Sequence, residues 1–205
     1  MKKASFKTAL AAACVWGAVG LGPAVAADAN HDFAVHGIGA LTCTQLTNAP
    51  AKAQEQVRVV LASWLLGYLT ALNRTDAVTY DATPVQDEGA LVNMVAGVCK
   101  LHPKVPVEAV AFSVFQSLDK AKLATASPEI KVTVGKSSTV LRQDTLSKVE
   151  KVLVSLKYLP AGQATGAFSG STAVALLKFQ TAQKLPTTGL PDPATVVRAL
   201  VELKT

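Results

Sequence analysis

The 205-residue sequence predicts an all-α protein with two helical domains behind an export signal. Apolar residues recur at helical spacing in separate segments between Glu55 and Leu203, which is typical of helices that bury one face. Only residues 130–134 alternate with the period of a strand. Glycine and proline separate the periodic segments, so we expect short helices joined by turns.

The first 26 residues have the pattern of a secretion signal peptide. Three lysines precede an apolar stretch over residues 9–22, and the small residues Ala24-Val-Ala26 follow as a cleavage site. The stretch is too short to span a bilayer comfortably, and no other segment of the sequence qualifies. We therefore expect an exported, periplasmic protein that is not membrane-integral.

The charge of the mature chain is modest. The formal charge of +6 includes the three lysines of the signal, so about +3 remains after cleavage. Such a surface is compatible with an anionic cell wall. No run of lysine and arginine is interleaved with aromatic residues, so nucleic acid is not a predicted partner.

Residues 39–118 are predicted to form a helical domain of three helices. The first spans residues 55–73, the second spans 87–100, and the third begins at Pro106. Each carries an apolar stripe at the spacing of a helix face. The residues expected to be buried are Val57, Val60, Leu61, Trp64, Leu65, Tyr68, Leu69, Leu72, Leu91, Met94, Val95, Val98, Val107, Val110, Val114 and Leu118.

Two cysteines remain once the signal, which contains Cys14, is removed. An even count in an oxidising compartment predicts one disulfide bond, between Cys43 and Cys99. The bond would tie the segment before the first helix to the end of the second.

Several residues of this domain resemble the HdeA/HdeB-like family of small periplasmic proteins. They are Cys43, residues 64–73, Val98-Cys99-x-x-His-Pro103 and Val107-x-Ala-Val110. The resemblance implies an all-helical fold with one disulfide, and its founding members are acid-stress chaperones. Acid-driven exposure of apolar surface requires carboxylates that titrate, and residues 39–118 carry few of them. We therefore expect this domain to bind a protein partner or client.

Residues 119–143 are interpreted as a linker. They show no sustained apolar period, apart from the alternation over residues 130–134. A lone strand would have no sheet to join, so we interpret this stretch as extended chain.

Residues 144–205 are predicted to form a C-terminal module of three helices. Asp192 can cap the last of these, with Pro193 at its first position. The expected apolar stripes are Val149, Val152, Leu153 and Leu156, then Ala175, Leu176 and Phe179, then Val196, Leu200 and Leu203.

The motifs of this module resemble the peptidoglycan-binding domain 1 family. The matching pattern is Gly166-x-Phe168, Thr172-x-x-Ala-Leu-x-x-Phe-Gln180, Leu185-x-x-Thr-Gly189 and Asp192-x-x-Thr195, with Leu200 at the end. The resemblance implies a three-helix module that binds peptidoglycan. It also implies a partly structural binding motif made of Gly166, Phe168, Thr172, Phe179, Gln180, Thr188 and Gly189. The chain departs from the family at Thr165-Gly-Ala-Phe-Ser-Gly170, where the family carries Asp-Gly-x-Phe-Gly-Pro.

No catalytic constellation is recognisable in the sequence. His31, His36 and His102 lack the spacing of zinc ligands, and the predicted disulfide uses Cys99. The adjacent acids at 87 and 88 open a helix, where carboxylates usually interact with the helix dipole. We predict no catalytic residue, no metal and no cofactor.

The sequence thus predicts a wall-associated, non-catalytic envelope protein. It would bind peptidoglycan through residues 144–205 and a partner or client through residues 39–118. The alternatives are an acid-stress periplasmic chaperone anchored to the wall, or an accessory subunit of a cell-wall hydrolase.

Overall fold

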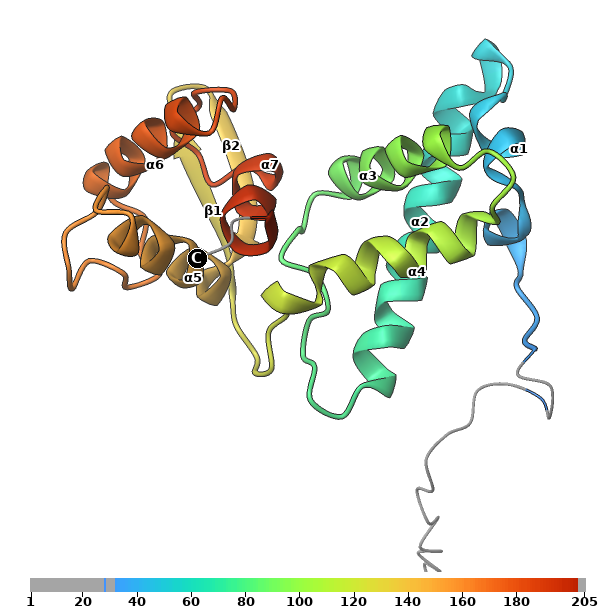
Figure 1. Ribbon diagram of the computed structural model, residues 1–205, viewed down its shortest axis with the longest axis horizontal. Coiled ribbons are helices and arrows are strands. Elements are labelled where there is room, and N and C mark those ends of the chain that lie inside the picture. The colour runs from blue at the N-terminus through green and yellow to red at the C-terminus, as the bar shows by residue number, and fades with distance from the viewer. Residues whose placement is uncertain (1–27, 29–31, 203–205) are drawn as a thin grey trace, which may run out of the picture. The chain divides into compact units, whose positions relative to one another are not determined.

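A computed structural model describes residue 28 and residues 32–202, mostly as helix (Figure 1). The predicted signal peptide lies outside the described residues. Within them, no helix is both long enough and apolar enough to cross a membrane. The all-α prediction is confirmed for most of this part of the chain, but it misses a two-stranded sheet.

The helical domain contains the three predicted helices and several shorter ones. The Asp87 carboxylate accepts the N–H of Ala90 at 2.6 Å and so caps the second predicted helix. That helix, α3, packs against both its neighbours, α2 and α4 (Figure 1). The elements are η1 (Gly37–Ala40), α1 (Cys43–Thr47), η2 (Ala51–Ala53), α2 (Gln54–Thr75), α3 (Glu88–Leu101), α4 (Val107–Leu118) and η3 (Asp119–Ala121).

A disulfide bond crosses the core of this domain. Cys43 in α1 bonds to Cys99 in α3, with the two Cα atoms 4.9 Å apart, which confirms the predicted pairing. Both cysteines are fully buried. One predicted core residue is misplaced, because Val60 lies at the edge of the α2 stripe and is 42% exposed. The buried apolar residues around the disulfide are Ile38, Leu46, Leu61, Leu65, Leu69, Val85, Leu91, Val92, Val95, Val107, Val110, Ala111, Val114, Phe115 and Leu118.

The aromatic residues of α2 belong to this packing. The Tyr68 ring lies between those of Trp64 and Phe115, with centroids 5.1 and 6.0 Å away. The Tyr68 hydroxyl donates to Glu108 Oε1 at 2.8 Å, and burial together with this acceptor raises the pKa of the hydroxyl. A Cβ on Gly39 would lie 2.1 Å from the Trp64 ring, so only glycine fits there.

The sheet is an antiparallel hairpin of β1 (Glu129–Val134) and β2 (Ser137–Arg142). Our interpretation of this stretch as extended linker was wrong, because residues 137–142 supply the partner strand that residues 130–134 seemed to lack. Gly135, with φ of +59°, forms the turn. Val132 and Leu141 are buried in the core of the C-terminal module, so the hairpin is packed against that module.

The C-terminal module contains the three predicted helices. They are α5 (Gln143–Ser155), α6 (Gly170–Ala182) and α7 (Pro193–Val197), and a π-helical turn continues the last one through Glu202. Leu203 lies outside the described residues. The buried apolar residues form a second cluster of Val132, Leu141, Leu146, Val149, Leu153, Leu159, Ala175, Leu176, Phe179, Leu190, Val196 and Ala199. Val197 and Val201 of the last helix pack against the cluster around the disulfide.

The connection between η3 and β1 is fastened by hydrogen bonds. The backbone of Leu123 exchanges hydrogen bonds with that of Asp81 in both directions, at 2.9 and 3.1 Å. The buried Asp81 carboxylate accepts from Arg142 Nε at 3.1 Å, and Arg142 Nη1 donates to the carbonyl of Ser127. The Ser127 hydroxyl accepts the N–H of Asp144 at the start of α5. Residues 123–128 are therefore held in place by hydrogen bonds at both ends.

Candidate functional site

The buried side-chain amide of Gln180 organises the connection between α6 and α7. Its Nε2 lies 2.9 Å from Thr188 Oγ1, from Thr195 Oγ1 and from the Leu190 carbonyl. Its Oε1 accepts the N–H of Gly189 at 2.9 Å. Because Gln180 is fully buried, these bonds replace the water that the amide would otherwise bind.

Thr188 and Gly189 are held in this connection by their own geometry. The Thr188 hydroxyl donates to Asp192 Oδ2 at 2.7 Å, and Asp192 Oδ1 caps α7 by accepting the N–H of Thr195. Gly189 has φ of +67°, a conformation that glycine adopts without strain. Both motif residues therefore shape a turn.

Glu150, which sequence reasoning missed, fixes the opposite connection. Its buried carboxylate accepts the N–H of Gly166 at 2.8 Å and the hydroxyl of Thr172 at 2.9 Å. Gly166 has φ of +75°, and a Cβ there would lie 2.9 Å from the carbonyl oxygen of Gln143. Ser169 then caps α6 by accepting the N–H of Thr172. This is the loop in which the chain departs from the family pattern.

The seven predicted motif residues therefore lie mostly inside the module. Thr172, Phe179 and Gln180 are fully buried. Gly166 and Gly189 are also buried, while Phe168 and Thr188 are half-buried. The structure brings these residues together mainly as core and turn residues of the module.

A groove on the surface of the module is lined by apolar, hydroxyl-bearing and charged residues. Its volume is about 760 Å³, and it lies where the chain leaves α5 and passes the outer face of α6. Its wall carries two lysines and no acidic residue. The lining residues are Val154, Lys157, Tyr158, Leu159, Pro160, Ala161, Gly170, Ser171, Val174 and Lys178.

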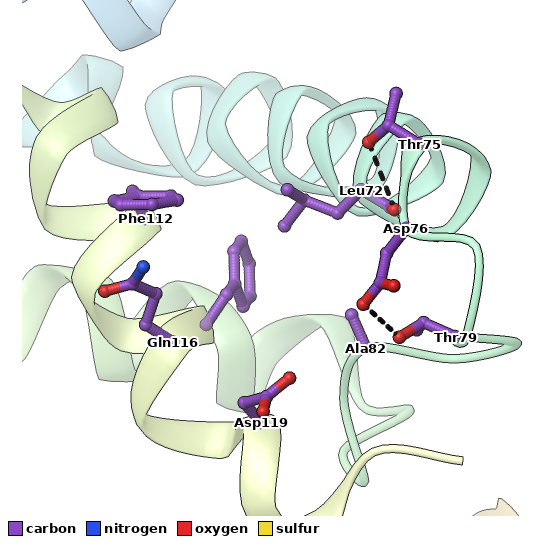
Figure 2. A pocket seen from close by; sticks show the side chains of 9 residues that line it. Leu72, Thr75, Asp76, Thr79, Ala82, Phe112, Gln116 and Asp119 are labelled. Carbon is purple, nitrogen blue, oxygen red and sulfur yellow. Dashed lines mark hydrogen bonds between the residues drawn. The ribbon is translucent and has the colours of Figure 1, made fainter. Parts of the chain in front are cut away.

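A second cavity, of about 410 Å³, lies in the helical domain between the end of α2 and α4 (Figure 2). Leu72 and the buried Phe115 form its apolar floor, and Phe112 stands on its rim with 42% of its surface exposed. Asp76 and Asp119 lie at its other end (Figure 2). The cavity thus combines an apolar floor with an acidic edge.

Asp76 accepts three hydrogen bonds at the acidic edge of this cavity. Its carboxylate accepts from the Thr79 hydroxyl at 2.5 Å, the Val78 N–H at 3.0 Å and Lys122 Nζ at 3.1 Å. These hydrogen bonds, that of Thr79 first, lower its pKa from 3.8 to about 2. Lys122 also contacts Asp119 at 2.9 Å, and the two carboxylates raise the pKa of its ammonium.

Replacement Asp76→Asn is expected to remove an acid-sensitive contribution to the stability of the helical domain. The folded state lowers the pKa of Asp76, so its contribution is complete above about pH 4 and disappears as the pH falls through about 2. Wild type should therefore be more stable than the variant at pH 6, with the two becoming equal near pH 2. Urea unfolding across this range measures the difference. A difference that stays constant down to pH 2 would contradict the assignment.

No group of three or more His, Cys, Asp or Glu side chains suited to holding a metal ion lies among the described residues. His36 and His102 are both exposed, and His31 is outside the described residues.

In a comparison with known protein families, the C-terminal part of the chain is similar to one family. The family model described as "Putative peptidoglycan binding domain" matches residues 142–198. No curated protein and no solved structure matches the chain. The resemblance of residues 39–118 to the HdeA/HdeB-like family remains a prediction. The matched segment runs from the end of β2 through α7, and peptidoglycan is the ligand that this match supports.

Proposed function

We propose that this protein is an exported, non-catalytic envelope protein that binds peptidoglycan through its C-terminal module and a second partner through its helical domain. The observation that carries the proposal is the family match over residues 142–198, a segment that supplies most of the second hydrophobic cluster. The buried disulfide supports export, because such bonds persist in oxidising compartments.

Removal of the C-terminal module is expected to abolish sedimentation with purified sacculi. The cut belongs after residue 126, because the hairpin contributes Val132 and Leu141 to the core of the module. The full chain should pellet with sacculi, and the chain ending at residue 126 should stay in the supernatant. Equal sedimentation of both proteins would show that the module is not the binding element.

The same sacculi distinguish binding from hydrolysis. A non-catalytic protein leaves the soluble muropeptide content of the supernatant unchanged over hours. Release of muropeptides by the purified protein would favour a hydrolase. Release only in the presence of a known hydrolase would favour the accessory-subunit alternative.

For the helical domain, the cavity of Figure 2 supports a binding role. An exposed aromatic ring beside an apolar floor fits an apolar side chain of a partner protein, and the acidic edge favours a basic neighbour on that partner. A photocrosslinker at position 112 tests this. If no protein is crosslinked from position 112 in cells, while a crosslinker in the module labels the wall, the cavity is not a docking site.

A further inference from the structure

We propose that the groove between the end of α5 and the outer face of α6 is the peptidoglycan contact of the module, and that it takes the carboxylate-bearing stem peptide. This inference rests on the proposed function and says which surface of the module binds the peptidoglycan. It starts from the burial of Thr172, Phe179 and Gln180, which leaves the most distinctive motif side chains unable to touch a polymer.

The groove has the size and chemistry for a short peptide with small side chains and acidic groups. Its volume of about 760 Å³ lies within the range of ligand-binding clefts. Val174, 52% exposed, and Pro160 offer apolar surface to methyl groups, while Tyr158 adds an aromatic edge. Lys157 and Lys178 are the charged groups of its lining, so its field favours carboxylates.

The sign of the charge separates this groove from the cavity of the helical domain. That cavity places Asp76 and Asp119 at its edge, with the ammonium of Lys122 already held by both. An anionic stem peptide would meet carboxylates there and free lysines in the groove of the module. Electrostatics therefore assigns the stem peptide to the module.

The backbone presents Lys157 in a fixed position. Lys157 follows the end of α5 with φ of +62°, and its N–H donates to the Val154 carbonyl at 2.9 Å. The next N–H, of Tyr158, donates to the Leu153 carbonyl at 2.8 Å. On the facing side, the Ser171 hydroxyl donates to Gln163 Oε1 at 2.6 Å. Both edges of the groove are thus held by hydrogen bonds before a ligand arrives.

The chain offers a matched pair of variants that separates binding from folding. Lys157 and Lys184 are both exposed lysines with positive φ, +62° and +56°, and each follows the end of a helix. Glycine adopts this conformation without strain, so Lys157→Gly and Lys184→Gly should both fold. Each removes one positive charge, but only Lys157 lines the groove.

The test is the binding of the full chain to purified sacculi at low and high salt. We expect Lys157→Gly and Lys178→Gln each to weaken binding about two- to fivefold, within the range for exposed charge pairs. Lys184→Gly should change binding less than about twofold. High salt should weaken wild-type binding and reduce the difference between wild type and the groove variants. Sacculi stripped of stem peptides by an amidase should bind wild type as weakly as intact sacculi bind the double variant.

The outcomes distinguish this inference from the function on which it rests. If wild type binds intact sacculi and the double variant of Lys157 and Lys178 binds equally well, the groove is wrong and the proposed function stands. Undiminished binding to stripped sacculi would overturn the stem-peptide assignment. If wild type fails to bind any sacculi, the proposed function itself falls, and this inference falls with it.

Discussion

Replacement Phe179→Ala is expected to unfold the C-terminal module at a cost of about 3–5 kcal/mol. The Phe179 ring is fully buried and packs in the cluster that joins α5, α6 and the hairpin. A module of this size has a small core and a low free energy of unfolding. A cavity the size of one aromatic ring therefore removes most of that free energy. Sacculus binding should disappear together with the fold.

Hydrogen exchange of α6 amides measures this effect locally. Trp64 fluorescence is unsuitable here, because Trp64 packs in the helical domain. Val174→Ala is the matched control, on the same helix but 52% exposed, and should change stability by less than about 0.5 kcal/mol. Binding is not compared for this control, since Val174 lines the groove. Retained protection of α6 in Phe179→Ala would contradict the assigned role of the ring.

Removal of the Cys43–Cys99 disulfide is expected to destabilise the helical domain by at most about 4 kcal/mol, from the entropy of the closed loop. The two residues are 56 apart in sequence and fully buried. Cys43→Ala with Cys99→Ala is the suitable double variant, because serine would leave hydroxyls buried without partners. Urea unfolding followed by Trp64 fluorescence measures the loss, and reduced wild type should behave like the variant.

The C-terminal module serves as an internal control for that experiment. Its buried residues form a second cluster, and only Val197 and Val201 of its last helix pack against the disulfide cluster, so exchange protection of α6 should change much less than that of α3. Mass spectrometry of unreduced peptides from protein isolated in its native compartment reports the bond directly. Two thiols that alkylate freely in that protein would refute both the bond and the inference of export drawn from it.

The helices could be predicted from the sequence because each buries one apolar stripe. The hairpin could not, because β2 reads Ser-Ser-Thr-Val-Leu-Arg and only Leu141 among its residues is buried. Glu150 escaped notice because a glutamate on an amphipathic helix is normally assigned to solvent. A usable signal did exist, since Leu146, Val149, Glu150 and Leu153 follow the spacing i, i+3, i+4, i+7.

The two cavities were beyond prediction for a different reason. The groove of the module depends on the path of residues 157–161 after α5. That path follows from a positive φ at Lys157, which no local sequence pattern predicts. The helical cavity needs Phe112, which lies off the buried stripe of α4, to face the end of α2. The motif pattern predicted the family whose model matches residues 142–198, but a pattern alone does not separate residues that hold a fold from residues that touch a ligand.

The enclosure of Gln180 and its partners determines what a genetic screen would find. Libraries selected for lost wall attachment are expected to contain mainly changes at buried positions, because an unfolded module and a disrupted binding surface give the same phenotype. Substitutions at Lys157 and Lys178 can be separated from those that unfold the module only when the screen also selects for protein that resists degradation. Positions that are sensitive to mutation in this chain are therefore mainly buried ones. The contact surface has to be sought among positions whose substitution leaves the protein folded.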